Sequence, residues 1–438
     1  MKLNGFRKHT KIERKNYSSI NRPHQNEKYL NNRITILKKT SLQGNVRSLP
    51  SSKSLSNRAL IINAMMGHKG ILENLSTARD TRLMQSLVNT PDHVIDVMDA
   101  GTTMRFLTAY FAITGQTKLL TGTDRMKERP IHLLVNALRT LGATIEYRGK
   151  EGFPPIEIKG FGQQLTDKIT IRGDVSSQFI SALMMSAPAL PNGLTLQLEG
   201  KIGSLPYLVM TAELMRLFGI NPELTGKQIR IPSGTYRPTT YRVEPDWSAA
   251  SYWFAFVALA ESAELLLPHV ASKALQGDRV IVDIMNLLGV NADFLHEGLL
   301  LTKTSGKLPN RLIWDFSNCP DLAQTVLPVC AARNVVGEFT GLESLRIKET
   351  DRIAALQTEL AKIGASLMEE QGHWNLTPGK VPPGKPSFQT YHDHRMAMGF
   401  APLATIMDFS LESPDVVNKS YPTFWEDMKG LGFTIQTS

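Results

Sequence analysis

Three segments place hydroxyl and basic side chains at the start of an expected helix. The segment 50–58 leads into an apolar stripe with helical spacing, and Ser52 or Ser54 can cap that helix. Lys53 and Ser54 then lie where free backbone N–H groups and the helix dipole favour an anion. Arg58, one turn further, adds a planar fork of donors for phosphate or carboxylate. The alternative is an ordinary capped helix whose cations are solvated.

The same arrangement returns twice. In the segment 100–105, Gly101 permits close backbone approach, two threonine hydroxyls are expected to cap a helix, and Arg105 follows on the first turn. In the segment 174–178, two serines and Gln178 precede another apolar helix. Each segment alone is a weak signal, but three in one chain point to the binding of anions.

A repeated phrase suggests how such helices are positioned. An amphipathic helix ends in an apolar residue, then Gly, then a short strand-like run, with the glycines spaced 77, 70, 75 and 68 residues apart. Gly adopts the left-handed conformation that ends a helix at low cost. Five matches at a near-constant period predict five or six duplicated units that mix strands with two helices, against the alternative of coincidental helix stops. The glycines are Gly142, Gly219, Gly289, Gly364 and Gly432.

The positive charge of the chain is concentrated at its N-terminus. The net charge is +9, and residues 1–33 hold nine Lys or Arg and two Glu, which leaves +2 for the other 405 residues. The body is therefore not built to track a nucleic-acid backbone. The polar, aperiodic segment 1–33 is expected to be a disordered extension. It lacks the apolar core of a signal peptide, and no run of 18 apolar residues exists, so neither secretion nor a membrane span is expected.

Cysteine and histidine usage gives no sign of a metal site. Cys319 and Cys330 are the only cysteines, and they fit buried, reduced thiols in a cytoplasmic protein better than a disulfide or a zinc site. His392 and His394 could form a metal pair at a strand edge, but no third ligand is evident. A structural role beside Arg395 is the preferred interpretation, and we expect no metal and no cofactor.

Six ordered motifs resemble the EPSP synthase (3-phosphoshikimate 1-carboxyvinyltransferase) family of enolpyruvyl transferases. The resemblance runs from about Ile34 to the C-terminus and leaves out only the basic extension. The motifs are Pro50-x-Ser-Lys-Ser-x-Ser-Asn-Arg58, Ala100-Gly-Thr-x-Met-Arg105, Arg125-Met-Lys-Glu-Arg-Pro130, Val175-Ser-Ser-Gln-Phe179, Arg346-x-Lys-Glu-Thr-Asp-Arg352 and Asp393-His-Arg-Met-Ala-Met398.

The resemblance implies an α/β fold of two similar domains, each of three βαβαββ units in an inside-out barrel, with substrates between them. The five repeated glycines fit such units if one copy has diverged. The chain would begin in one domain, form the whole of the other domain, and then return to complete the first. The expected domains are 34–51 with 246–438, and 52–245, with 1–33 outside both. The crossings fall near Pro50 and the segment 243–247.

By resemblance, two small molecules bind in the cleft of a monomeric, cytoplasmic enzyme of aromatic amino-acid biosynthesis. The residues implied for shikimate 3-phosphate are Lys53, Ser54, Arg58, Ser176, Ser177, Gln178, Ser204, Asp321 and Lys348. Those implied for phosphoenolpyruvate are Lys53, Gly101, Arg129, Gln178, Arg352, Arg395 and Lys419. The chemistry agrees, because desolvating several phosphate and carboxylate charges requires many cations and hydroxyls.

The implied reaction adds the 5-hydroxyl of shikimate 3-phosphate to C2 of phosphoenolpyruvate, protonates C3 and then eliminates phosphate. It needs a base, an acid and a cation for the leaving group. Asp321 resembles the family's carboxylate near the hydroxyl, Glu349 the residue beside C3, and Lys53 could steady phosphate and proton. Asp321 could instead cap a helix, and Glu349 could simply pair with Arg352.

Three positions depart from the family pattern, and two other functions remain as alternatives. Asp99 stands where many members have Asn, Phe106 where Pro is frequent, and Ser344 where a substrate-contacting Asn is common, so Ser344 receives no role. A transferase acting on UDP-N-acetylglucosamine would share fold and mechanism but typically uses a loop cysteine. An RNA-binding or RNA-end-processing protein would exploit the basic extension, but the near-neutral body disfavours it.

Overall fold

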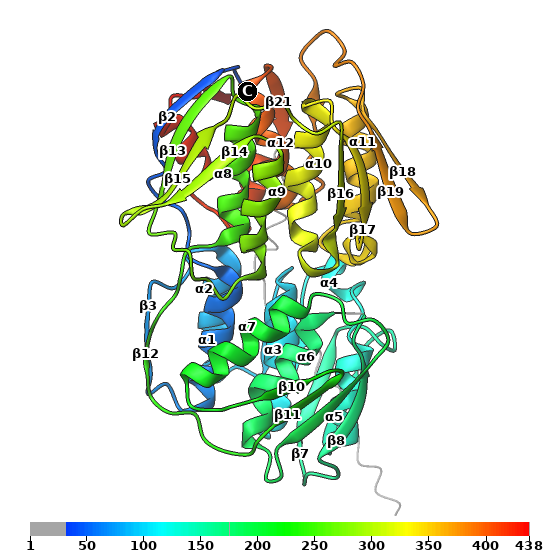
Figure 1. Cartoon of the computed structure of the whole chain (residues 1–438). Coiled ribbons are helices and arrows are strands. Elements are labelled where there is room, and N and C mark those ends of the chain that lie inside the picture. Colours follow the sequence, from blue (N-terminus) through cyan, green and yellow to red (C-terminus); the bar gives the residue numbers. More distant parts are fainter. Residues whose placement is uncertain (1–31, 175, 438) are drawn as a thin grey trace, which may run out of the picture.

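The computed structural model describes residues 32–174 and 176–437, so most of the expected N-terminal extension lies outside the described residues. Figure 1 shows two halves stacked along the long axis of the molecule. The lower half contains the elements between residues 53 and 242, and the upper half contains those of residues 33–45 and 247–437. No helix in the described ranges is long and apolar enough to cross a membrane.

Within residues 32–174 and 176–437, each half contains three sheets, and five of the six sheets share one strand order. In the sheet β16-β17-β19-β18, the parallel pair β16–β17 is followed by the antiparallel hairpin β18–β19. Helices α10 and α11 connect these strands, which makes a βαβαββ unit. The elements are β16 (Arg311–Asp315), η3 (Phe316–Asn318), η4 (Pro320–Leu322), α10 (Ala323–Ala332), β17 (Val336–Thr340), η5 (Glu343–Ile347), α11 (Arg352–Ala361), β18 (Ser366–Glu370) and β19 (His373–Thr377).

Two lower units repeat this order within continuous sequence. The first has β4 (Val94–Asp96), α3 (Gly101–Ile113), β5 (Lys118–Thr121), α4 (Asp124–Lys127), α5 (His132–Leu141), β6 (Ala143–Tyr147) and β7 (Ile156–Phe161). The second has β8 (Lys168–Arg172), α6 (Ser177–Ser186), η1 (Ala187–Ala189), β9 (Leu194–Glu199), α7 (Leu205–Leu217), β10 (Glu223–Thr225) and β11 (Gln228–Ile231). The third lower unit is reduced to the parallel pair β3–β12, which explains why the sequence repeat misses it. Its elements are α1 (Lys53–Met65), β3 (Ile71–Glu73), α2 (Arg79–Leu87) and β12 (Thr240–Arg242).

The other two upper units are each completed by a strand from the start of the chain. Strand β2 pairs in parallel with β13, and β1 lies between β21 and β22. One unit has β2 (Ser41–Asn45), α8 (Trp247–Leu259), β13 (Ser262–Pro268), η2 (Gly277–Val280), α9 (Ile281–Leu287), β14 (Val290–Phe294) and β15 (Gly298–Lys303). The other has β20 (Ser387–Phe388), α12 (His394–Phe400), η6 (Ala401–Thr405), β21 (Phe409–Glu412), η7 (Pro414–Lys419), α13 (Phe424–Gly430), β22 (Ile435–Thr437) and β1 (Arg33–Ile36).

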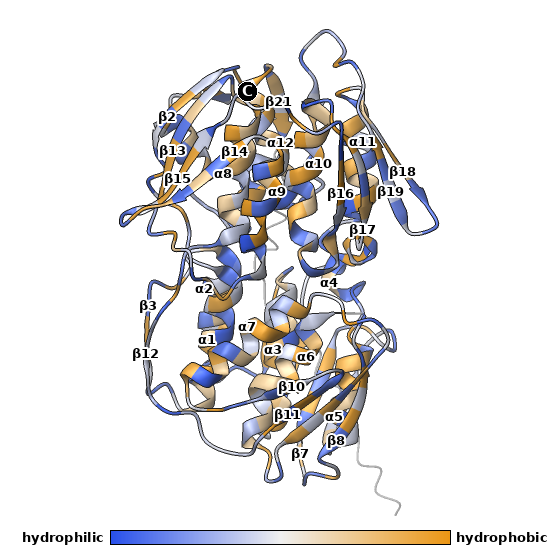
Figure 2. Ribbon diagram, viewed as in Figure 1, coloured by the Kyte–Doolittle hydropathy of each residue, from blue (hydrophilic) through white to orange (hydrophobic). Residues whose placement is uncertain are grey.

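Each half has its own apolar core. The buried hydrophobic residues form one cluster within 55–243 and another that combines 34–46 with 247–433. Apolar residues are concentrated in central helices such as α8, α10 and α6 (Figure 2). Cys319 and Cys330 are buried free thiols, as expected. The two cores are consistent with the expected two domains, whose boundaries stay a prediction.

The two segments that join the halves are hydrogen-bonded to each other. Ser51 and Pro245 form an isolated β-bridge, and the Ser52 amide donates to the Glu244 carbonyl at 2.9 Å. The Asp246 side chain then accepts from the Lys53 amide and from the Ala249 amide, at 3.1 and 3.0 Å. One carboxylate thus holds the first turns of α1 and α8, one helix from each half.

The five glycines predicted to end helices all have positive φ. The values are 118° for Gly142, 85° for Gly219, 84° for Gly289, 80° for Gly364 and 87° for Gly432. A hairpin follows Gly142 as expected, formed by β6 and β7. The conformational rule behind the repeat is therefore confirmed at every one of these positions.

Replacing Gly364 by Ala should destabilise the fold by roughly 2–4 kcal/mol, which combines left-handed strain with a steric clash. An added Cβ would lie 2.1 Å from the Lys380 carbonyl oxygen. Gly372 is a matched control, because its φ is also 80° but nothing lies within 4 Å of its Cβ position. Urea unfolding of both variants measures the difference. Equal losses would contradict the clash and leave only backbone strain.

Candidate active site

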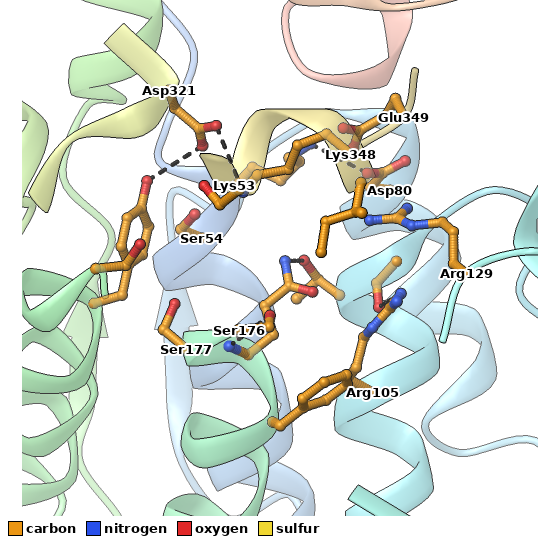
Figure 3. Close-up of a pocket in the computed structure, with 18 of the residues that line it drawn as sticks. Lys53, Ser54, Asp80, Arg105, Arg129, Ser176, Ser177, Asp321, Lys348 and Glu349 are labelled. Carbon is orange, nitrogen blue, oxygen red and sulfur yellow. Dashed lines mark hydrogen bonds and ion pairs between the residues drawn. The ribbon is translucent and has the colours of Figure 1, made fainter. Parts of the chain in front are cut away.

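Nearly all the predicted site residues meet in one cavity between the halves. Figure 3 shows side chains from α1, α3 and α6 below and from the η4 and η5 regions above pointing into it. Of the predicted residues, only Lys419 does not line the cavity. Those that do are Lys53, Ser54, Arg58, Gly101, Arg129, Ser176, Ser177, Gln178, Ser204, Asp321, Lys348, Glu349, Arg352 and Arg395.

Two of the three expected helix caps are formed, and the third is not. Ser52 accepts from the Leu55 amide at 3.3 Å at the start of α1, and Ser176 accepts from the Gln178 amide at 3.3 Å at the start of α6. The expected threonine cap of α3 is wrong, because its N-cap is Ala100 and no side chain caps it. The Thr102 hydroxyl instead accepts from the Gln178 amide group at 3.0 Å, which ties α3 to α6.

The lower half presents three buried guanidinium groups without a carboxylate partner. Arg58 donates only to neutral groups, among them Thr211 at 2.8 Å, and Arg105 donates to the Gly101 carbonyl at 3.0 Å. Within the described residues, Arg58, Arg105 and Arg129 have no carboxylate oxygen within 4.0 Å. Burial lowers the pKa of Arg58 to about 10, and burial with the Arg129 charge lowers the pKa of Arg105 strongly. Buried, uncompensated cations of this kind call for an anionic ligand.

Gly101 lies directly beneath two of these guanidinium groups. A Cβ at this position would meet Arg129 Nη1 at 2.6 Å and Arg105 Nη1 at 2.8 Å. Only a residue without a side chain leaves both cations in place at the start of α3.

The upper half pairs its cations with carboxylates. Arg352 is 1% exposed and contacts Asp393 at 2.7 Å, Asp321 at 2.9 Å and Glu349 at 2.9 Å. Arg395 contacts the other Asp321 oxygen at 3.0 Å, and Lys348 lies 3.9 Å from Asp321. The carboxylates expected to react are thus fixed by buried ion pairs, so the Asp321 side chain is not a helix cap. The expected alternative contact of Glu349 with Arg352 is present.

Charge sets the protonation state of these two carboxylates. Burial would raise the pKa of Asp321, but the charges of Arg395, Lys348 and Arg352 outweigh it and hold the pKa far below its usual range. Burial likewise opposes the charges of Arg352, Lys419 and Arg129, which hold the pKa of Glu349 well below its usual range. Both groups are therefore ionised near neutral pH when the cavity holds no anion.

Several residues of the site carried no signal in the sequence. Asp80 accepts from the Lys53 ammonium at 3.1 Å, and Tyr207 donates to Asp321 at 3.3 Å across the two halves. Ser344, to which the sequence assigned no role, also lines the cavity. The contacts of Asp80 and Tyr207 join residues far apart in the sequence, and no local motif marks them.

His394 is part of the cavity wall. Its ring is 2% exposed, and neither ring nitrogen has a hydrogen-bond partner among the described residues. Burial, with the Lys53 and Arg395 charges, lowers its pKa well below the usual range, so the ring is neutral. In the described part of the chain, no group of three or more His, Cys, Asp or Glu side chains could hold a metal ion.

The fold matches that of solved EPSP synthase structures. Two solved structures of EPSP synthase from Acinetobacter baumannii align with TM-scores of 0.71 at 20% and 19% identity. Each alignment covers 93% of this chain and 100% of the other. This likeness establishes the mixed α/β architecture expected from the sequence.

Sequence comparisons find relatives that are more similar to this chain than the two solved structures are. The family model for EPSP synthase (3-phosphoshikimate 1-carboxyvinyltransferase) matches residues 85–428. A 3-phosphoshikimate 1-carboxyvinyltransferase of Bacteroides fragilis is 46% identical over 393 residues, 89% of this chain and 95% of the relative. The enzyme of that name from Methanospirillum hungatei is 33% identical over 415 residues, 87% of this chain and 94% of the relative. The chain belongs to the EPSP synthase family, and the expected resemblance is confirmed.

Asp278 is a buried carboxyl whose raised pKa can be tested through the pH dependence of the unfolding free energy. It is 4% exposed, accepts a short hydrogen bond from Ser248, and burial with the Asp321 charge raises its pKa to about 6. A carboxyl whose folded pKa is raised stabilises the fold below its unfolded pKa, and this contribution is lost as pH rises through the folded pKa. Unfolding free energy should therefore fall between about pH 4 and 6, by roughly 2–3 kcal/mol from this group.

Asp278→Asn should remove that part of the pH dependence, which urea unfolding from pH 4 to pH 8 measures. Asp124→Asn, at a fully solvated carboxylate, is the control and should keep the wild-type slope. An unchanged slope in Asp278→Asn would mean that the Asp278 carboxylate is compensated in the folded state.

Proposed function

We propose that this chain is an enolpyruvyl transferase of the shikimate pathway. It transfers the carboxyvinyl group of phosphoenolpyruvate to the 5-hydroxyl of shikimate 3-phosphate and releases phosphate, acting as a monomer without a cofactor. Family membership supports the reaction class. The observation that carries the assignment to this cavity is the set of unpaired guanidiniums, Arg58, Arg105 and Arg129, facing the fixed carboxylates Asp321 and Glu349.

The proposed ligand contacts follow the division of charge in the cavity. The starts of α1 and α6 offer hydroxyls, backbone N–H groups and Arg58 to the phosphate of shikimate 3-phosphate. Its ring would reach Ser204, Asp321 and Lys348. The phosphoenolpyruvate anion would lie among Arg129, Arg352, Arg395, Lys419, Gln178 and the Gly101 amide, with Lys53 between the two substrates.

In the proposed chemistry, Asp321 acts as a base, and Glu349 acts first as an acid and then as a base. Ionised Asp321 accepts a hydrogen bond from the 5-hydroxyl and takes its proton as the oxygen bonds to C2. Glu349 delivers a proton to C3 and later removes one as the C2–phosphate bond breaks. Two anionic substrates beside Arg129, Arg352 and Lys419 offset the charges that depress the Glu349 pKa, so Glu349 can carry that proton in the complex. Lys53 stabilises the charge of the leaving phosphate, which takes up the proton that the 5-hydroxyl gave to Asp321, so no net proton stays on the protein.

Activity should depend on both substrates. The purified full chain should release phosphate from phosphoenolpyruvate only when shikimate 3-phosphate is also present, as a coupled phosphate assay measures. Release with UDP-N-acetylglucosamine in place of shikimate 3-phosphate would assign the chain to the related transferase, and no release with either acceptor would refute the proposal.

Glu349→Gln and Asp321→Asn should each lower kcat by ~10²–10⁴-fold, the usual contribution of proton transfer. The KM values should change less, because the amides keep the shape of the side chains. Steady-state kinetics on both substrates separates the two effects. If kcat stays within twofold in both variants, the carboxylates serve only as partners of Arg352.

A further inference from the structure

Lys419, in the upper half, contacts the lower half through Asp99, a residue to which the sequence assigned no role. The ammonium of Lys419, at the end of η7, donates to Asp99 Oδ2 at 2.8 Å and to the Asp99 carbonyl oxygen at 3.1 Å. Asp99 lies just before the first turn of α3, next to Ala100 and Gly101. The contact therefore crosses from the upper half to the segment that leads into the anion-binding start of α3.

A second cation holds the other oxygen of Asp99. Arg79, at the start of α2, contacts Asp99 Oδ1 at 2.5 Å. The side chain of Lys419 is 3% exposed, whereas those of Asp99 and Arg79 are 32% and 42% exposed. Arg79 offsets the charge of Asp99, so Arg79, Asp99 and Lys419 together carry a formal charge of +1.

Lys419 does not itself line the cavity but lies beside Glu349, which does. Its Nζ is 4.0 Å from Glu349 Oε1, so the ammonium lies between Glu349 and Asp99. Burial lowers the pKa of Lys419, but the charges of Asp80, Glu349 and Asp99 outweigh it and raise the pKa. A lysine side chain loses rotamer entropy when it is fixed, and the two contacts with Asp99 make that loss before any ligand arrives.

We propose that Asp99 is a positioning residue for the phosphate-bearing enolpyruvyl donor. It holds the Lys419 ammonium against the lower half at the place where the donor anion binds, and Arg79 fixes the carboxylate that does so. This inference rests on the proposed function, because it assigns Lys419 to the donor. Asp99 then increases donor affinity, although it is itself an anion beside an anion site.

The test measures KM for each substrate and kcat in the full chain. Asp99→Ala should raise the KM for phosphoenolpyruvate about tenfold and leave the KM for shikimate 3-phosphate within about twofold. Asp99→Asn keeps a neutral acceptor and the side-chain shape, so its KM for phosphoenolpyruvate should rise only about threefold. Asp408→Ala is the matched control, since Asp408 pairs with Lys385 at similar exposure and does not line the cavity. It should keep wild-type kinetics.

A double-mutant cycle separates positioning from a general effect on the fold. Lys419→Met should raise the KM for phosphoenolpyruvate, and adding Asp99→Ala to it should raise that KM less than twofold further, because the two act as one unit. An unchanged or lowered KM for phosphoenolpyruvate in Asp99→Asn would overturn the inference, as would multiplying effects in the cycle. If Asp99→Ala fails to fold, Asp99→Asn and the cycle built on it decide. Failure of the proposed function is distinct, since wild type would then release no phosphate with the two substrates.

Discussion

The site depends on the buried guanidinium of Arg352. It contacts three carboxylates that come from η4, from the residues before α11 and from the start of α12. A buried ion of this kind is stable only when its donors are satisfied, and removing one partner typically costs 3–5 kcal/mol. Because Asp321 and Glu349 are two of its partners, the groups assigned to proton transfer are placed by the same interaction that makes the burial of Arg352 possible.

The two walls of the cavity treat charge differently. The upper wall compensates its cations with Asp321, Glu349 and Asp393, whereas the lower wall leaves Arg58, Arg105 and Arg129 without carboxylates. If only the cations are counted, both walls are positively charged and repel each other. The carboxylates bring the net charge of the upper wall close to zero. An anionic ligand thus supplies the negative charge that the lower wall lacks. The upper wall is already close to neutral, which limits the desolvation needed on binding.

Features governed by local rules were predictable from the sequence. The five helix-ending glycines were found because a left-handed residue at a helix end restricts its own residue type. The helix starts at Lys53 and Ser177 were found because hydroxyls and amides meet there within one turn. The placement of Asp321 and Glu349 came only through resemblance to a family, since neither residue sits in a locally diagnostic pattern.

Features that depend on distant residues were not predictable. The Lys53–Asp80 and Lys419–Asp99 contacts join residues 27 and 320 positions apart, and the sequence holds nothing that pairs them. The threonines of α3 were assigned to its cap because the local pattern allowed it. Thr102 instead accepts from Gln178, 76 residues away, a partner that only the packing of α3 on α6 supplies. The sixth unit escaped the repeat because only two of its strands remain.

The strand order has a consequence for how the chain can be made. Strand β1 pairs with β21 and β22, so Ile34 finds its neighbours Leu411 and Thr437 only after those residues have been translated. At ~5–20 residues per second, a ribosome needs roughly 20–80 s to produce the intervening ~400 residues. The elements of residues 53–242 are contiguous and can fold as they emerge, while β2 stays unpaired until β13 is made and β1 until β21 and β22 are made. A nascent chain that stalls before β21 therefore carries β1 as an unpaired strand with exposed backbone N–H and C=O groups, which favours aggregation until synthesis resumes.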